Sequence, residues 1–153
     1  MRGANRARQT ALRAAAYPIA LVALMVFVVG CSSGQGSARL VGTPVQVNES
    51  DFRISVSPVR VPAGDVVLTI RNHGPASHEL IVVKARALPM PFRTDGLTVD
   101  EERLERATVG IAEPGAPGSV RHLRIHMRPG LYKFFCNMSG HYLGGMHTEV
   151  VAS

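Results

Sequence analysis

Short segments in which apolar and polar residues alternate fill much of the chain after residue 41, and they constrain its fold more than any other feature. The segments TPVQV, FRISVSP and SVRHLRIHM alternate as half-buried strands do. Phe52, Ile54 and Val56 are expected to share one face. Turn signals such as PAG and RPG separate the segments at a spacing of roughly 8–12 residues. This pattern predicts an all-β chain, an antiparallel sandwich or barrel.

Further strands are expected where apolar residues run together. One lies around Val66–Ile70, after the PAG turn, and the segment HELIVVK has the composition of a buried strand. LYKFF leads directly into Cys136, and TEVVA is expected to be the last strand. Tyr132, Phe134 and Cys136 share strand parity, so we expect all three side chains to face the core.

One segment departs from the strand pattern and predicts a short helical insert. In TVDEERLERATVGI, Val99, Leu104 and Ala107 fall at helical spacing. Thr98 and Glu101 form a capping box at its start. The flanking segments ALPMPFRTDG and AEPGAPG are expected to be loops. The apolar side chains of the first loop either pack beneath the insert or form an exposed patch; they are Leu88, Met90 and Phe92.

The first thirty residues predict an export signal. A basic stretch precedes the apolar run AAAYPIALVALMVFVVG, which is short for a membrane span and contains Pro18. The ending VVGC resembles the lipobox of bacterial lipoproteins, which implies cleavage before Cys31 and a lipid on its sulfur. An uncleaved anchor is the alternative. We expect a signal peptide over 1–30, a lipidated Cys31 with a flexible tether over 31–40, and a domain over 41–153 outside the cytoplasmic membrane.

Charge and cysteine content narrow the possibilities further. Four of the 17 Lys and Arg residues lie in the first thirty positions, and the rest nearly balance the 11 acidic residues. The net charge of +6 therefore does not indicate nucleic-acid binding. The only two cysteines are Cys31 and Cys136. A disulfide between them is disfavoured because lipidation would use Cys31, which leaves Cys136 to be buried or bound.

The segment CNMSGHYLGGMH at 136–147 concentrates residues that bind transition metals. A thiolate, imidazoles and a thioether suit copper, since soft sulfur favours Cu(I) and imidazole accepts both oxidation states. Cys136, His141 and Met146 follow a C-x4-H-x4-M spacing, and three glycines allow a tight loop. The second imidazole of such a site must come from elsewhere. His78 is the natural candidate, because it begins the next buried run after the Val66–Ile70 strand.

Here the sequence resembles the cupredoxins, the plastocyanin- and azurin-like blue copper proteins. The resemblance rests on VPAGDVVLTIRNHGPASHEL followed by PGLYKFFCNMSGHYLGGM, and it covers about residues 41–153. It implies a Greek-key sandwich and one type 1 copper ion, with His78, Cys136 and His141 as ligands and Met146 as the axial ligand. Glu79 departs from the family pattern, in which plastocyanin and azurin have Asn after the first ligand.

The remaining histidines, methionines and asparagines have other expected roles. Zinc is disfavoured because a structural zinc site needs clustered Cys and His. His122 and His126 lie on a predicted strand, where they are too far apart for one ion. Met138 is a rival axial ligand to Met146. Two interpretations apply alike to His73, His147, Asn72 and Asn137: a place at the surface, which is favoured for the histidines, or a hydrogen bond that supports a ligand. In the second case Asn72 would pin the loop carrying His78, and the segment around Asn137 would offer a backbone N–H to the Cys136 sulfur. No catalytic constellation is recognisable, so we do not expect an enzyme.

The resulting expectation is a membrane-tethered, monomeric electron carrier outside the cytoplasm. By resemblance, the exposed ligand His141 would serve as the electron port, with Tyr142 and Leu143 beside it to contact redox partners transiently. A copper-binding protein for copper supply or resistance is the alternative, and a module that binds no metal is a third possibility.

Overall fold

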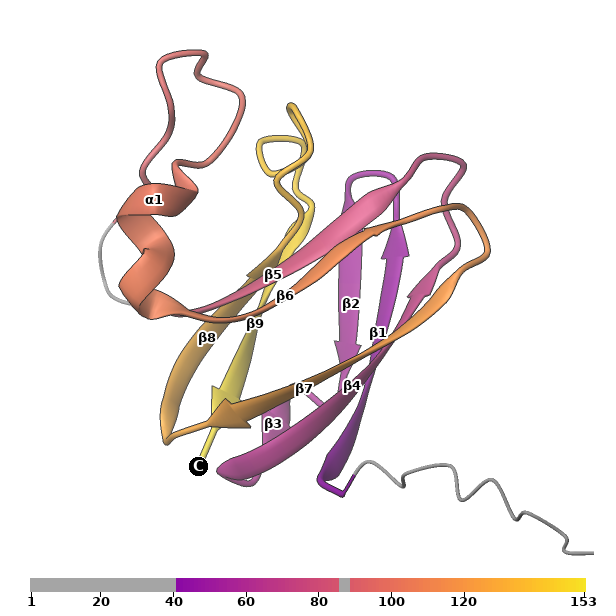
Figure 1. The fold of residues 1–153 in the computed structure, drawn as a ribbon, viewed down its shortest axis with the longest axis vertical. Helices are drawn as coiled ribbons and strands as arrows, with labels where there is room; N and C mark the ends of the chain where they lie inside the picture. The colour runs from indigo at the N-terminus through magenta and orange to yellow at the C-terminus, as the bar shows by residue number, and fades with distance from the viewer. Residues whose placement is uncertain (1–40, 86–88) are drawn as a thin grey trace, which may run out of the picture. The chain divides into compact units, whose positions relative to one another are not determined.

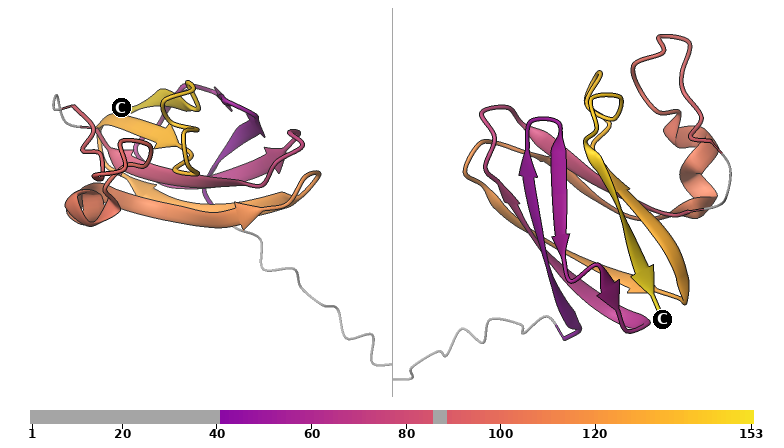
Figure 2. Two further views of the ribbon diagram at one scale, coloured as in Figure 1. Left: turned by 90° about the horizontal axis from the view of Figure 1, so that it is seen from above. Right: turned by 180° about the vertical axis from the view of Figure 1, so that it is seen from behind.

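The alternating segments form two sheets that face each other (Figures 1 and 2). The computed structural model describes residues 41–85 and 89–153, so the predictions for residues 1–40, including Cys31, and for Leu88 lie outside the described residues. The strands are β1 (Thr43–Ser50), β2 (Arg53–Ser57), β3 (Arg60–Val61), β4 (Gly64–Asn72), β5 (His78–Lys84), β6 (Thr108–Gly115), β7 (Val120–Met127), β8 (Gly130–Phe135) and β9 (His147–Ala152).

The strand order is β2-β1-β4-β7 in one sheet and β3-β9-β8-β5-β6 in the other. This arrangement confirms the predicted β-sandwich. Most pairs are antiparallel, but β1 pairs with β4 and β3 pairs with β9 in parallel. Period-two alternation does not reveal these two parallel pairs, because side chains alternate in the same way in both kinds of ladder.

The core lies between the sheets and is built from the inward-facing positions of the alternating segments. On β8, Tyr132 and Phe134 are buried, and Cys136 continues the same face, as the parity of the sequence predicts. Ile54 and Val56 face this core from β2. Burial of large apolar side chains on both inner faces is the main stabilising contribution to such a sandwich.

The outer face of the second sheet carries a smaller core of its own. Ile81 and Val83 of β5 are buried there together with Phe135, on the side away from the main core. Met90 and Phe92 pack against them, which favours packing over an exposed patch for this loop. Because β5 is buried on both faces, its sequence is a continuous apolar run and does not alternate.

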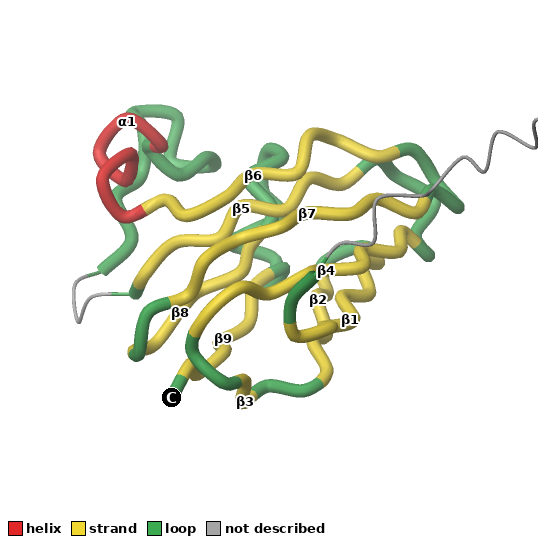
Figure 3. Tube along the Cα trace, turned by 60° about the horizontal axis from the view of Figure 1, so that its bottom comes forward, coloured by secondary structure: helices red, strands yellow, loops and turns green. Residues whose placement is uncertain are grey.

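The predicted insert is present but differs in detail. It consists of α1 (Glu101–Leu104) followed by a 3-10 turn, η1 (Glu105–Ala107), which leads into β6 (Figure 3). The predicted capping box at Thr98 is wrong, because the side chain of Asp100 accepts the hydrogen bond from the N–H of Arg103. No helix in residues 41–85 and 89–153 is long and apolar enough to cross a membrane.

The structure contradicts two predictions, one about a loop and one about a buried strand position. The segment from Ala112 to Gly115 belongs to β6 and not to a loop; Pro114 is tolerated there because β6 is an edge strand. Phe52 does not join Ile54 and Val56 on the buried face. It lies in the two-residue turn between β1 and β2, with a φ of 60° and 52% of its surface exposed. The turn rotates its side chain out of the alternation.

The main core should respond strongly to truncation on β8. Replacement of the fully buried Phe134 by Ala should lower the free energy of unfolding by about 3–5 kcal/mol, because it removes a large apolar side chain and leaves a cavity. Urea denaturation of the copper-free protein measures this. Leu131→Ala on the same strand, at a position 38% exposed, is the control and should cost less than about 1 kcal/mol. Equal losses would contradict the assignment of the core.

Candidate metal centre

Three adjacent strands bring the candidate ligands to one end of the second sheet. His78 is the first residue of β5, Cys136 follows the last residue of β8, and Met146 precedes the first residue of β9. The register pairs Phe135 with Ile81 on one side and with His147 on the other. Because β8 runs antiparallel to both neighbours, its end lies beside the beginnings of β5 and β9. Ladder pairing alone therefore gathers residues that are far apart in sequence.

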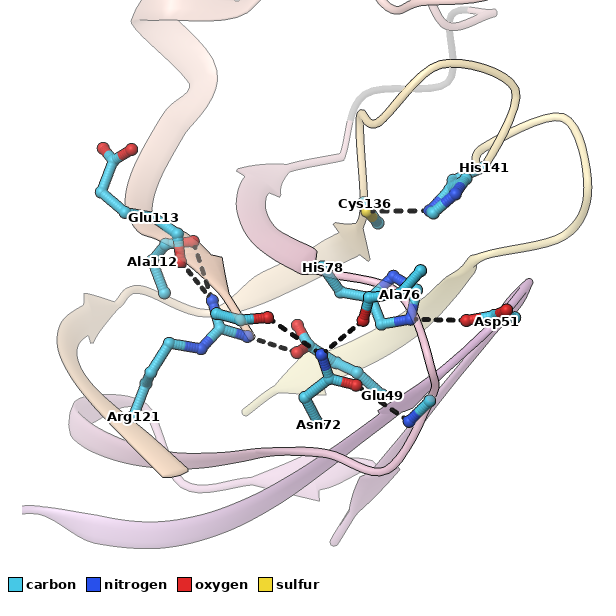
Figure 4. A network of polar contacts seen from close by, with 12 residues as sticks. Glu49, Asp51, Asn72, Ala76, His78, Ala112, Glu113, Arg121, Cys136 and His141 are labelled. Carbon is cyan, nitrogen blue, oxygen red and sulfur yellow. Dashed lines mark hydrogen bonds and ion pairs between the residues drawn. The ribbon is translucent and has the colours of Figure 1, made fainter. Parts of the chain in front are cut away.

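The donor atoms of His78, Cys136 and His141 all lie within 4.8 Å of one another. Cys136 Sγ lies 3.5 Å from His141 Nδ1, and the two imidazole centroids are 5.2 Å apart (Figure 4). His78 and Cys136 are fully buried, whereas His141 is partly exposed. The sequence-predicted equatorial residues thus form one compact cluster with a single solvent-facing member.

The loop between β8 and β9 folds back on itself so that Met146 rejoins Cys136. The N–H of Cys136 donates to the carbonyl of Met146 at 3.1 Å, and the N–H of Met146 donates to the carbonyl of His141 at 2.9 Å. Gly140 and Gly145 adopt φ values of 78° and 101°, which residues with a Cβ rarely take. The Met146 side chain is fully buried and belongs to the same core cluster as Cys136.

Asn72 holds the turn that leads from β4 to His78, as the sequence suggested. The Asn72 side chain donates to the carbonyls of Ala76 and Gly115 and accepts from the N–H of Gly74, all at 2.8–2.9 Å. This buried amide fixes the turn between β4 and β5. It also joins that turn to β6, so that His78 enters β5 from a defined direction.

His78 has one nitrogen engaged and one without a partner. Its Nε2 lies 3.0 Å from Oδ1 of Asp51, in the turn between β1 and β2. Its Nδ1 is buried and has no hydrogen-bond partner among the described residues. A buried polar atom without a hydrogen-bond partner lowers the stability of the fold unless a water or an ion binds it. Asp51 was not singled out by the sequence, because an acidic residue in a hairpin turn is ordinary.

Electrostatics favour neutral groups in the metal-free cluster. Burial, reinforced by the neighbouring His141, lowers the pKa of His78, and Asp51 opposes this only in part. Burial raises the pKa of the Cys136 thiol, although the backbone N–H groups of Met138 and Glu79 donate to its sulfur and act in the opposite direction. A neutral imidazole is ready to ligate, whereas the thiol must lose its proton when a metal binds.

This donor set fits a single soft or borderline transition-metal ion. It combines one buried sulfur, two imidazoles and a buried thioether on the same loop. The unpartnered Nδ1 of His78 supports this fit, because a bound ion would satisfy it. The cluster of His78, Cys136 and His141 holds no carboxylate, which disfavours ions that prefer oxygen ligands.

Asn137 ties the helical insert to the ligand loop. Its side chain accepts from the N–H of Val99 at 2.6 Å and donates to the carbonyl of Val99 at 3.0 Å and to Oε1 of Glu101 at 2.7 Å. A backbone bond from Gly140 to the carbonyl of Leu97 adds a second link. The insert is therefore a support for the residues next to Cys136.

Glu79 completes this support from the other side. Its Oε1 accepts from the N–H of Asn137 at 3.1 Å, so that β5 and the ligand loop are joined directly after their respective ligands. Burial, with a contribution from nearby Glu101, raises the pKa of the Glu79 carboxyl. Glu79 thus joins β5 to the ligand loop from the position where plastocyanin and azurin have Asn.

A partly buried ion pair lies near the site, and nothing in the sequence analysis indicated it. Glu49 of β1 is fully buried and pairs with Arg121 of β7, whose guanidinium also donates to the carbonyls of Ala112 and Glu113 on β6 (Figure 4). These contacts join the two sheets at the edge near the ligand loops. Burial raises the pKa of Glu49, and the charge of Arg121 counteracts it. Glu49 shares strand parity with buried Val45 and Val47, but nothing in the local sequence indicates a partner for its carboxylate.

The other residues named from the sequence lie around the cluster. Cys136 is an unpaired thiol in the described part of the chain. Leu143 is 55% exposed, whereas Tyr142 packs edge-on against Phe92 and Phe135 and stacks on His147. Met138 packs partly against the main core. The remaining histidines are exposed: His73, His122, His126 and His147.

Comparison with solved structures identifies the fold as that of the cupredoxins. Reduced auracyanin from Roseiflexus castenholzii matches with a TM-score of 0.56 at 18% identity, over 74% of this chain and 98% of that chain. Auracyanin A, a blue copper protein from Chloroflexus aurantiacus, matches with a TM-score of 0.54 at 16% identity, over 72% and 99%. Rusticyanin from Thiobacillus ferrooxidans matches with a TM-score of 0.52 at 17% identity, over 74% and 79%.

Comparison with protein-family models and with curated protein sequences finds no match. At the identities of the structural matches, the likeness establishes the cupredoxin fold.

Removal of the Asn137 side chain should detach the insert from the ligand loop. Asn137→Ala should lower the free energy of unfolding by about 2–4 kcal/mol, because two buried backbone groups of Val99 each lose a partner. Thermal or urea unfolding of the copper-free protein measures the change. Asn48→Ala, which removes one side-chain contact to exposed His73, is the control and should change stability by about 0.5 kcal/mol or less. A loss no larger than in the control would show that the insert is held by other contacts.

Proposed function

We propose that this chain is a blue copper protein that carries single electrons between redox partners. One copper ion would be held by the thiolate of Cys136 and the imidazoles of His78 and His141, with Met146 as a weak axial ligand. The observation that carries this proposal is the convergence of three donor groups within 4.8 Å in a cupredoxin fold, with Met146 buried on the same loop. Copper bound in this set supplies a one-electron Cu(II)/Cu(I) couple.

The residues around the ligands support electron transfer by keeping the site rigid. Asn72 fixes the loop before His78, and the backbone bonds between Cys136, His141 and Met146 fix the return of the ligand loop. A site held in one geometry needs little rearrangement when its charge changes, as preorganised sites do in general. Burial of Cys136 and His78 excludes water from the sulfur and from one imidazole.

His141 is the natural route for the electron, since it is the partly exposed member of the ligand cluster. Exposed Leu143 on the same loop and exposed Phe52, whose ring lies edge-on to His141 at 5.4 Å, form an apolar rim beside it. A small apolar contact suits a transient redox complex. Tyr142, by contrast, would support the loop from within, because it packs against Phe92 in the segment before the insert and against Phe135.

The location of the protein is part of the proposal. The basic and apolar N-terminal sequence and Cys31 support export and attachment by a lipid at Cys31, with the domain on the extracytoplasmic side of the membrane. The polar residues after Cys31 would act as a tether that lets a monomeric domain reach successive partners.

Copper titration of the purified chain tests the site. Addition of Cu(II) should produce a strong thiolate-to-copper charge-transfer band in the visible spectrum at one equivalent. Cys136→Ser should abolish it, because the band requires the sulfur. Met138→Ala, which removes the thioether not assigned to the metal, should retain the band and serves as the control. A colourless or weakly absorbing wild-type complex would refute the proposal.

Voltammetry then separates an electron carrier from a protein that only supplies or stores copper. A carrier should give a reversible one-electron wave at a single potential and retain its copper through repeated cycles. Loss of copper on reduction would instead indicate a role in copper supply or resistance.

A further inference from the structure

The turn between β1 and β2 reaches both imidazoles of the cluster, although it contributes no ligand. Asp51 Oδ1 lies 3.0 Å from Nε2 of His78 (Figure 4). The next residue, Phe52, places its ring 5.4 Å from that of His141. Two consecutive residues of one turn therefore contact the two histidines that precede and follow Cys136 in sequence.

Two glycines in the surrounding backbone, Gly74 and Gly144, leave room for these contacts. A Cβ on Gly74 would lie 2.7 Å from Asp51 Oδ1 and 2.8 Å from His78 Nε2, so a side chain there would displace the pair. A Cβ on Gly144 would lie 2.2 Å from the ring of Phe52. Phe52 itself adopts a φ of 60°, an uncommon conformation for a bulky residue. The close fit against Gly74 and Gly144 shows that the turn is held in a defined position beside the cluster.

The Asp51 contact determines which nitrogen of His78 can bind a metal. A carboxylate only accepts hydrogen bonds, so Nε2 of a neutral His78 must carry the proton. Nδ1 then presents its lone pair, and Nδ1 is the buried atom that has no partner among the described residues. The hydrogen bond thus selects the tautomer that a metal ligand requires.

We propose that Asp51 is a positioning residue for His78, and that its negative charge lowers the reduction potential of the copper site; this inference rests on the proposed function. The hydrogen bond orients the ring and makes Nδ1 a stronger donor, as carboxylate partners of metal-bound histidines do. A negative charge one residue removed from the metal also favours Cu(II) over Cu(I). The Asp51 side chain is 36% exposed, so solvent reduces this charge effect without abolishing it.

The first test needs no copper. In the copper-free full chain, purified in mild detergent, nitrogen-detected NMR should show His78 as the Nε2–H tautomer with a slowly exchanging proton. In Asp51→Ala, that proton should exchange faster and the tautomer should become mixed. An unchanged His78 signal in a folded Asp51→Ala protein would overturn the positioning role.

The second test measures the charge effect. Asp51→Asn keeps the shape and an acceptor oxygen but removes the charge, so it should fold, bind copper and show a higher potential than the wild type. Cu(II) affinity should fall by about 10–100-fold, as for other partners of metal-bound histidines. Each tenfold loss of Cu(II) over Cu(I) affinity corresponds to a rise of about 59 mV.

Asp65→Asn is the matched control. Asp65 is an exposed aspartate at the opposite end of β4, paired with Arg124 and His126. Its replacement removes the same charge from the protein and should leave the potential unchanged. Equal potentials for wild type and Asp51→Asn, or equal shifts in the two variants, would overturn the charge effect. Absence of a blue copper band in the wild type would instead refute the proposed function, so the two failures are distinguishable.

Discussion

The pairing of β8 with β5 and β9 is the constraint on which the site depends. Because β8 is antiparallel to both neighbours, its C-terminal end lies beside the N-terminal ends of the other two strands. Cys136, His78 and Met146 occupy those ends, and His141 lies on the loop that connects two of them. This register is therefore what brings the ligand residues together. The apolar core formed by Tyr132, Phe134 and their neighbours maintains that register, since a slip of one residue would turn Cys136 to the other face.

The polar side chains at this end of the sandwich bind backbone groups that are buried there. Donors and acceptors removed from water need partners, and Asn72 and Asn137 each satisfy several backbone groups of the ligand loops. Glu49 and Arg121 pair within the first sheet, and the Arg121 guanidinium also donates to backbone carbonyls of β6 in the second. Among the described residues, Nδ1 of His78 is the buried imidazole nitrogen that has no partner. The residues that stabilise the loops thus also leave the donor atoms available.

The insert and the turn between β1 and β2 support the site from opposite directions. The insert covers the outer face of β5, and its Val99 backbone is bound by the residue that follows Cys136. The turn places Asp51 and Phe52 against the two imidazoles. Neither segment contributes a ligand, yet both restrict where the ligands can move. The rigidity of the candidate metal centre therefore arises from loops packed on loops as well as from the sheets.

The sequence by itself determined the sandwich, the inward parity of Cys136 and the local grouping of Cys136, His141 and Met146, because strand alternation and short loops are properties of neighbouring residues. It indicated His78 through its place at the start of a predicted buried strand and through the resemblance to the cupredoxins. It did not reveal the contact of Asp51 with His78, the outward position of Phe52 or the pair of Glu49 with Arg121. Asp51 and His78 are 27 positions apart, and Glu49 and Arg121 are 72 apart. The left-handed backbone of Phe52 leaves no signal in the hydrophobic alternation. Only the tertiary structure decided them, because the order of the strands in each sheet and the packing of the two sheets set which side chains from distant segments meet.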